Sequence, residues 1–316
     1  MESPQNIKKR LKSVNNIGQI TKAMELVSAT KMRKSQQIAL DSRPYSFAAL
    51  DFMATISALE NQKLPELFAV RKNIKKVLFV LVSSDKGLAG AFNSSVFKKF
   101  ELHIKEDKDK HAGEEKLYVA VGEKSFAYLN KKGFKILKKF KNVGDYITPE
   151  QVRPMVDFVV NGYLDKSWDR VIFISTHFRS ALKQEPHVRR VLPIDYDHIA
   201  DTIKQIIPER GKFADLIKEH NLNFVPDKKK LKEYTIEPKP EKVLEKLAEH
   251  LFFMQIYHLI LEANASEHSA RRMAMKTASD NASDLGSALN LQYNKSRQSR
   301  ITTEISEISA GAEALN

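Results

Sequence analysis

Residues 244–293 read LEKLAEHLFFMQIYHLILEANASEHSARRMAMKTASDNASDLGSALNLQY, and the spacing within this stretch sets the architecture of the chain. Its seam positions recur in alternating steps of three and four, which keep one face of an α-helix turned toward a partner helix. The seam comprises Leu244, Leu247, Leu251, Met254, His258, Leu261, Ala265, His268, Arg272, Met275, Ser279, Ala282, Gly286, Leu289 and Tyr293. No proline follows Pro240, so the sequence predicts one helix over residues 240–316, about 100 Å long. A helix of this length indicates a mechanical or scaffolding role.

A second proline-free helix is predicted at the other end of the chain, from about Ser3 to Ser42. Ser3 can cap its N-terminus, with Pro4 at the first helical position. The apolar seam expected on this helix comprises Ile7, Leu11, Val14, Ile17, Ile20, Met24 and Val27. The simplest interpretation is an intramolecular coiled coil made from both ends of the chain, although a homodimeric coiled coil fits the same periodicity. After Pro44 the helical pattern resumes to about Leu59, so we expect an N-terminal coiled-coil region over residues 1–60.

The middle of the chain predicts a small α/β domain over residues 73–233. Continuous apolar runs at 77–82, 117–121 and 171–174 are typical of strands buried on both faces, and 188–192 fits an edge strand. Helical patterns at 95–104 and 149–164 lie between the runs, which favours a mostly parallel, Rossmann-like sheet. A polar insertion is expected at about 195–232. The fold class is therefore α/β, with this domain inserted between the helices of a long coiled coil that ends in the helix 240–316.

Composition limits the possible functions. The 316 residues carry a net charge of +13 and no cysteine, which excludes disulfides and thiol chemistry. No apolar run approaches the ~20 residues of a membrane span, and we expect no signal or transit peptide. Between Ile7 and Lys34, eight lysines and arginines accompany the single acid Glu25, so the segment suits an acidic partner surface as well as simple solubility.

The sequence predicts no catalytic residue, no metal site and no cofactor. Ser84–Asn93, SDKGLAGAFN, follows a strand and opens a helix, where a phosphate loop would sit. It lacks the G-x-G-x-x-G triplet and the Gly-Lys-Ser/Thr ending, so a tight turn is the favoured interpretation. His250, His258 and His268 do not have the spacing of a helical metal site, and we interpret them as seam or surface residues.

Both ends of the chain resemble one known family. Residues 7–33, IKKRLKSVNNIGQITKAMELVSATKMR, resemble the N-terminal helix of the ATP synthase gamma subunit. AMKTASDNA at 274–282, YNKSRQ at 293–298 and ITTEISEISAGAEA at 301–314 resemble its C-terminal helix, and SDKGLAGAFN resembles a turn of the same family. The insertion at 195–232 and the missing cysteine pair of chloroplast members are departures from the pattern.

The resemblance implies a central-stalk rotor of a bacterial proton-translocating ATP synthase, non-catalytic by itself, whose two terminal helices form a long antiparallel coiled coil. Its implied partners are three alpha and three beta subunits, the epsilon subunit and the membrane ring of c subunits. Its implied location is the cytoplasmic side of the bacterial inner membrane, as a peripheral protein. The resemblance assigns contacts with the alpha–beta hexamer to Met24, Arg271, Arg297, Gln298, Thr302 and Glu304. It assigns contacts with the c ring to Tyr234 and Glu237.

Two other classes of function fit parts of the sequence. A basic coiled-coil protein that binds nucleic acid would be expected to combine arginines with stacking aromatic residues. Residues 8–34 contain no aromatic residue, which weighs against that class. A dinucleotide-dependent enzyme would need the glycine pattern that Ser84–Asn93 lacks. The sequence therefore favours the rotor.

Overall fold

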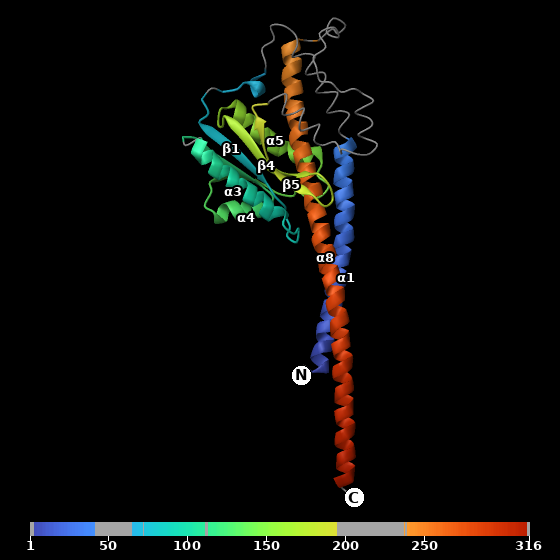
Figure 1. Ribbon diagram of the computed structural model, residues 1–316. Coiled ribbons are helices and arrows are strands. Elements are labelled where there is room, and N and C mark those ends of the chain that lie inside the picture. The colour runs from blue at the N-terminus through green and yellow to red at the C-terminus, as the bar shows by residue number, and fades with distance from the viewer. Residues whose placement is uncertain are drawn as a thin grey trace. The chain divides into compact units, whose positions relative to one another are not determined.

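The computed structural model of the protein describes residues 3–41, 65–71, 73–110, 113–194, 237 and 239–314 (Figure 1). The chain divides into two compact units. The coiled-coil unit comprises residues up to Ala29 and from Arg271 onward, and the α/β unit comprises Thr30–Ala270. Both terminal helices are thus divided within their length, whereas the sequence suggested borders near residues 60 and 240. The helix expected up to Leu59 and the insertion at 195–232 lie outside the described residues.

The elements alternate between helix and strand in the middle of the chain, as the sequence predicts. In order they are α1 (Pro4–Asp41), the 3-10 turn η1 (Glu66–Phe68), β1 (Lys76–Val82), α3 (Phe92–Lys110), β2 (Glu115–Val121), α4 (Glu123–Lys131), β3 (Ile136–Phe140), α5 (Pro149–Leu164), β4 (Arg170–Phe178), β5 (Gln184–Leu192) and α8 (Pro240–Ala314). The predicted N-cap is present, because the Asn6 N–H donates to Ser3 Oγ at 3.4 Å. The helix α8 is 75 residues long, which confirms the predicted long C-terminal helix.

The five strands form one sheet in the order β3-β2-β1-β4-β5. The first four are parallel, and β5 runs antiparallel to β4 at one edge. This confirms the mostly parallel sheet and the edge strand at 188–192. The pair α4 and β3 was not predicted. The sequence of β3, ILKKF, has two lysines and only partial burial at the opposite edge of the sheet, so it lacks the continuous apolar run that marks the inner strands.

Both faces of the sheet are covered, and β1 shows how the sequence divides between them. Leu78, Val80 and Val82 point into one core, whereas Val77, Phe79 and Leu81 point into the other. Alternate residues of a strand face opposite sides of the sheet, so an unbroken apolar run serves two cores. The second core is closed by apolar residues of α3 and α4, including Val96, Phe100, Ile104 and Leu129.

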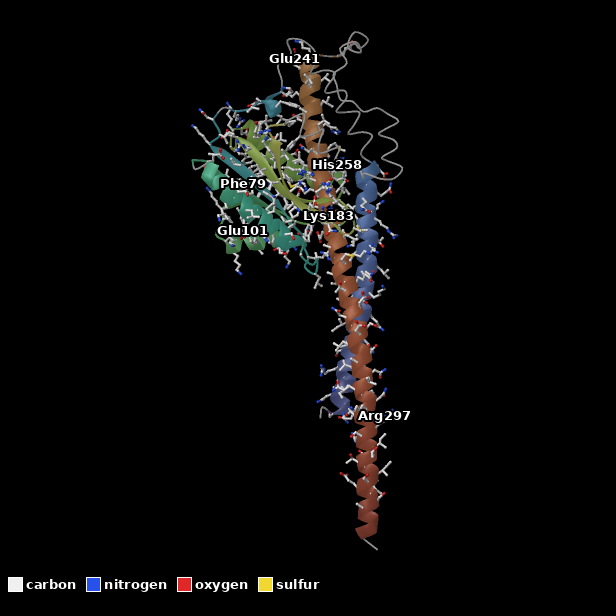
Figure 2. The ribbon with its side chains drawn as sticks, viewed as in Figure 1. Phe79, Glu101, Lys183, Glu241, His258 and Arg297 are labelled. Carbon is white, nitrogen blue, oxygen red and sulfur yellow. The ribbon has the colours of Figure 1, made fainter. Side chains whose placement is uncertain are left out.

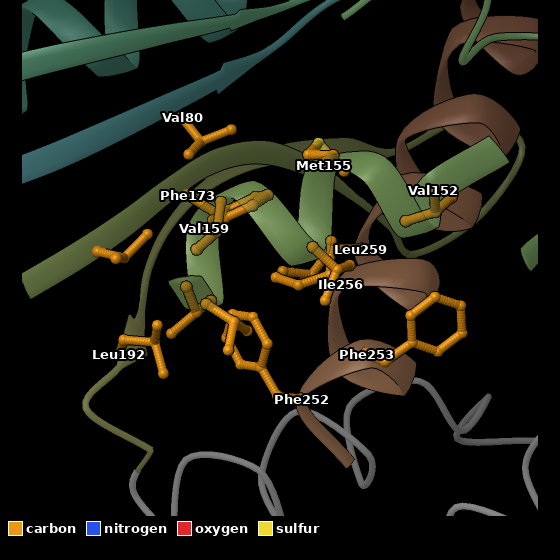
Figure 3. Close-up of a cluster of buried hydrophobic side chains, with 14 of the residues drawn as sticks. Val80, Val152, Met155, Val159, Phe173, Leu192, Phe252, Phe253, Ile256 and Leu259 are labelled. Carbon is orange, nitrogen blue, oxygen red and sulfur yellow. The ribbon is translucent and has the colours of Figure 1, made fainter. Parts of the chain in front are cut away.

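The first core is closed by α5 and by the beginning of α8 (Figure 3). Val152, Met155 and Val159 of α5 meet Phe252, Ile256 and Leu259 of α8 in one buried cluster with Val80, Phe173 and Leu192 of the sheet. From Leu251 to Ser269 almost every residue of α8 is buried. A helix surrounded on all sides is part of a core rather than one strand of a two-helix seam. The expected seam from Leu244 to His268 therefore does not face a single partner helix, and this part of the prediction was wrong.

The turn between β2 and α4 requires glycine at residue 122. Gly122 has φ +92°, and a Cβ built there would overlap the backbone carbonyl of Ser83. Gly133 has φ +75° but open space around the Cβ position, and Gly113 has neither constraint. Comparing an alanine substitution at each of these three glycines therefore separates the free-energy cost of the backbone conformation from the cost of a steric clash.

We expect Gly122→Ala to lower the free energy of unfolding of the α/β unit by about 3 kcal/mol or more, because it combines strain with overlap. Gly133→Ala should cost about 1–2 kcal/mol from the left-handed conformation alone, and Gly113→Ala should stay within about 0.5 kcal/mol of the wild type. Urea unfolding followed by the fluorescence of Trp168, the single tryptophan, reports on this unit. Equal stabilities of the three variants would contradict the turn geometry.

Candidate functional site

In the coiled-coil unit, α1 and α8 lie side by side and antiparallel (Figure 1). A Cβ at Gly18 would lie 3.4 Å from Ala282 Cβ, and a Cβ at Gly286 would lie 3.2 Å from Asn15 Oδ1 and 3.9 Å from Val14 Cγ1. Residue numbers therefore rise on one helix as they fall on the other. The antiparallel coiled coil expected from the family resemblance is confirmed.

The seam of α8 in this unit matches the sequence prediction, but the seam of α1 does not after Val14. Met275, Ala282, Gly286 and Leu289 of α8 are buried as expected. In the part of α1 that belongs to this unit, the buried positions after Val14 are Thr21, Glu25 and Ser28, with Gly18 partly buried. The expected seam residues Ile17, Ile20 and Val27 are 53%, 59% and 54% exposed, so that prediction was wrong.

Small residues explain the shift of the α1 seam. Gly18, Thr21 and Ser28 let the backbones of the two helices approach closely, and helix separation depends on the side chains at the contact. The polar atoms of the seam are satisfied within α1, since Thr21 Oγ1 donates to the Ile17 carbonyl and Ser28 Oγ donates to the Met24 carbonyl. The larger apolar residues are consequently turned away from α8.

The outer surface of the coiled-coil unit therefore carries large apolar side chains. The exposed residues are Ile17, Ile20, Leu26 and Val27 on α1 and Met273, Leu285, Leu291, Ile301, Ile305 and Ile308 on α8. Exposed apolar side chains of this size can be covered by another protein. The coiled coil is therefore a candidate interaction surface.

The last part of α8 continues past the beginning of α1 (Figures 1 and 2). The register places the start of α1 beside about residue 296, and residues 297–310 are all exposed. We call residues 297–310 the terminal segment. Thr302 Oγ1 donates to the Gln298 carbonyl at 3.0 Å, and Arg300 Nε donates to Glu304 Oε1 at 2.7 Å. These contacts lie within the helix, so they hold the polar groups along its surface.

The structure brings some of the predicted contact residues together and separates others. Arg297, Gln298, Thr302 and Glu304 are exposed within two turns of the terminal segment. Arg271 is buried about 39 Å away along the same helix, at 1.5 Å per residue. Met24 is partly buried on α1 beside the seam position Glu25. These six residues therefore form at least two separate sites.

The two residues expected to contact a c ring precede α8. Glu237 is exposed, and Tyr234 lies outside the described residues.

In the α/β unit, the loop Ser84–Asn93 is a structural turn. Asp85 Oδ1 accepts the N–H of Glu123, and Asp85 Oδ2 accepts the N–H of Asn142, both at 3.0 Å. The Ser84 N–H and hydroxyl both lie 3.1 Å from Asn93 Oδ1. The Ser84 N–H and hydroxyl, which a phosphate loop would offer to a ligand, are bonded to Asn93, and the Asp85 carboxylate holds two neighbouring segments. This geometry supports the tight-turn interpretation.

A charged node in the α/β unit joins α1 and α8 to the loop before α5. Asp145 of that loop accepts from Lys31 Nζ at 2.6 Å and from Lys86 Nζ at 3.4 Å, and its other oxygen lies 3.3 Å from His268 Nε2. Desolvation raises the pKa of Asp145, but the hydrogen bond from Lys31 and the surrounding positive charges outweigh it and hold the pKa below its usual range. The node was missed from sequence because its partners are far apart in the chain.

Among the described residues, no group of three or more His, Asp or Glu side chains is placed to hold a metal ion. No helix in the described ranges is long and apolar enough to cross a membrane.

Comparisons with known proteins agree across sequence and structure. The family model described as ATP synthase matches residues 3–315. The ATP synthase gamma chain of Roseiflexus castenholzii is 34% identical over 316 residues, covering 100% of this chain and 99% of the relative. The gamma chain of Bdellovibrio bacteriovorus is 36% identical over 317 residues, with 100% and 99% covered. In the solved mitochondrial ATP synthase of Euglena gracilis, one chain superposes with a TM-score of 0.63 at 19% identity, covering 99% of this chain and 94% of that chain.

The lowered pKa of Asp145 gives a pH-dependent prediction. A carboxylate with a depressed pKa contributes stability above its ordinary pKa and loses it as the pH falls through the folded value. We therefore expect Asp145→Asn to destabilise the α/β unit most near pH 7 and least near pH 3, measured by urea unfolding with Trp168 fluorescence. Asp157→Asn, at an exposed position of α5, is the matched control. A difference between Asp145→Asn and wild type that stays constant from pH 7 to pH 3 would contradict the ion-pair role.

Proposed function

Because this chain belongs to the ATP synthase gamma subunit family, we propose that its coiled coil turns inside a ring of alpha and beta subunits. The chain is a central-stalk subunit of the ATP synthase complex and is non-catalytic by itself, with catalysis at the beta subunits. It couples rotation to the synthesis or hydrolysis of ATP. The fold of the chain supports this role, since one long helix can reach from one partner to another.

The finer set of partners is part of the proposal. The solved structures with a similar fold are described as a rotor, as OSCP/F1/c-ring and as central stalk/c-ring assemblies. We propose three alpha subunits, three beta subunits, the epsilon subunit and a c ring as partners of this chain. The gamma chains of Roseiflexus castenholzii and Bdellovibrio bacteriovorus come from bacteria, which supports a peripheral location on the cytoplasmic side of a bacterial inner membrane.

The observation that carries the proposal is the outward apolar surface of the coiled-coil unit. Ile17, Ile20 and Val27 face away from the seam, and Ile301, Ile305 and Ile308 are exposed on the terminal segment. We propose that Ile301, Ile305 and Ile308 turn in an apolar sleeve, where few directional bonds form, so this end of the helix does not strongly trap any angle of rotation. A free monomer gains nothing from exposing these side chains, whereas a surrounding ring of subunits buries them.

The asymmetry of the rod provides the mechanism. Two unlike antiparallel helices have no three-fold symmetry, so three beta subunits around them would each meet a different face. Each beta subunit would then favour a different nucleotide affinity, and rotation would move all three through the same cycle. This is a coupling free energy between sites, and it acts in both directions.

We propose separate roles for the residues that the family resemblance singles out. Arg297 and Gln298 on the terminal segment would bond to a loop of a beta subunit, with Thr302 and Glu304 beside them. Charge-assisted hydrogen bonds of this kind favour particular rotary angles by ~1.5–3 kcal/mol each. Arg271 and Met24 would contact the alpha–beta hexamer at positions separate from the terminal segment, and Tyr234 and Glu237 would face the c ring.

Co-purification tests the function most simply. A tagged chain expressed with its own alpha and beta subunits should retain both after washing in high salt, and the complex should hydrolyse ATP. A parallel purification without nuclease addresses the nucleic-acid alternative. Recovery of nucleic acid without alpha and beta subunits would refute the rotor.

We predict that Met24→Lys uncouples the complex. Met24 is partly buried beside the seam, so a lysine there can extend outward and form an ionic contact with a neighbouring subunit. Such a contact would stabilise one rotary angle by ~1–3 kcal/mol. Assembly and much of the ATP hydrolysis should persist, while proton pumping and ATP synthesis fall. Both activities are measured on the same membranes.

The exposed neighbour Ala23 provides a control for added charge, as Ala23→Lys. If Met24 only fills space between the helices, Met24→Lys should instead lower assembly and thermal stability, with hydrolysis and pumping falling in parallel. That parallel loss would overturn the uncoupling prediction.

A further inference from the structure

Within the α/β unit, a short stretch of α8 carries polar side chains at buried positions. Glu262, Asn264, His268 and Ser269 are all at most 6% exposed, in a helix whose preceding turns are mainly apolar. Burying polar and charged groups is costly unless each one is hydrogen-bonded or paired. Glu262 and Ser269 contact β4, β5 and their connection, and Asn264 and His268 contact the loop before α5, so their burial has a structural purpose beyond filling the core.

One face of this stretch is bonded to β4, β5 and the connection between them. Glu262 Oε2 lies 3.0 Å from His177 Nδ1 on β4 and 3.6 Å from Arg189 Nη1 on β5. Burial raises the pKa of Glu262, but the hydrogen bond with His177 and the charge of Arg189 outweigh it and lower the pKa below its usual range. Seven residues later, Ser269 Oγ donates to the Ala181 carbonyl at 2.7 Å.

A different face is bonded to the loop before α5. Asn264 Nδ2 donates to the Val143 carbonyl at 2.7 Å, and His268 Nε2 donates to the Gly144 carbonyl at 3.1 Å. This loop is itself held in place, because the Asn142 N–H donates to Asp85 and Asp145 pairs with Lys31. The loop therefore offers fixed acceptors to α8.

The two sets of bonds come from opposite sides of the helix. At about 100° per residue, Glu262 and Ser269 point within about 20° of each other, and Asn264 and His268 within about 40°. Asn264 points about 200° from Glu262, which is nearly the opposite direction. A hydrogen bond fixes both distance and direction, so bonds on opposite faces resist turning of the helix about its own axis as well as sliding along it.

We propose that residues 262–269 of α8 form a torsional clamp, through which the α/β unit transmits torque to the rod. This inference rests on the proposed rotor function and adds the residues that transmit the torque. In a rotor, force applied to the α/β unit must turn α8 rather than slip around it. Apolar packing holds α8 against the α/β unit, whereas the directional bonds of Glu262, Asn264, His268 and Ser269 fix the rotation of the helix about its own axis.

The clamp is tested with two single variants and their combination in the assembled complex. Glu262→Gln keeps the shape of the side chain but removes its charge, and Asn264→Leu keeps the size but removes the donor to Val143. Leu259→Ala, at a fully buried apolar position of the same helix, supplies a control that lowers stability without touching the clamp. ATP hydrolysis and ATP-driven acidification of liposomes are measured on the same preparations, along with the thermal midpoint of each variant.

We expect the ratio of pumping to hydrolysis to fall about threefold in the double variant, within the range by which mutations alter coupling between sites. The double variant should lose more than the two single variants together, because either face can hold the helix while the other is intact. Leu259→Ala should keep the wild-type ratio even where its thermal midpoint is as low as that of the double variant.

Three outcomes are distinguishable. If the Leu259→Ala control and the double variant lose coupling equally at matched thermal midpoints, the polar residues serve stability alone and the clamp is refuted. If the double variant keeps the wild-type ratio, the clamp is likewise refuted. If the wild-type chain itself fails to assemble with alpha and beta subunits or to pump, the proposed function fails, whatever the variants do.

Discussion

The structure depends on one helix meeting two different demands. The first part of α8 is surrounded by the α/β unit from Leu251 to Ser269, and the part after Arg271 packs in the coiled-coil unit along a single seam. Within the α/β unit the helix needs large apolar residues on all sides, such as Phe252, Ile256 and Leu259. Within the coiled-coil unit it needs only a narrow stripe of residues that pack against α1. The absence of proline after Pro240 allows both parts to belong to one uninterrupted helix. A subunit that transmits force benefits from this arrangement, because an uninterrupted helix has no joint at which torque is lost.

In the coiled-coil unit, α1 after Val14 reverses the usual distribution of residues. Small and polar residues such as Gly18, Thr21 and Ser28 line its seam, and isoleucines face outward. Close backbone contact gives a slender rod, and the outward apolar surface suits a surrounding protein ring. The stability of this unit therefore depends on its partners as well as on its own seam, which is a common property of obligate assemblies.

Much of the fold could be predicted from the sequence, because its signals are local. The apolar run of β1, the helical pattern of α5 and the three–four spacing of α8 each lie within a single element. The seam of α1 was misplaced after Val14 because hydrophobicity favours Ile17 and Ile20, whereas close packing against Ala282 favours Gly18. The strand β3 was missed because its two lysines interrupt the apolar run by which the other strands were recognised. The partners of Asp145 and Glu262 could not be predicted, since they lie 114 and 85 residues away along the chain, at Lys31 and His177, and only the tertiary fold brings them together. The residues assigned to partner subunits rest on the family resemblance, because the exposure of Arg297 and Gln298 does not identify the atoms that they contact.

Direct observation of rotation tests the central claim, which is that this chain turns as a rotor within its complex. The chain contains no cysteine, so Lys99→Cys at an exposed position of α3 gives a unique attachment point for a bead on the α/β unit. The hexamer of alpha and beta subunits, made free of cysteine, is fixed to a surface and supplied with ATP. Our account predicts that the bead rotates continuously in one direction and stops when ATP is removed. A bead that stays still while the same complexes hydrolyse ATP at their normal rate would contradict it.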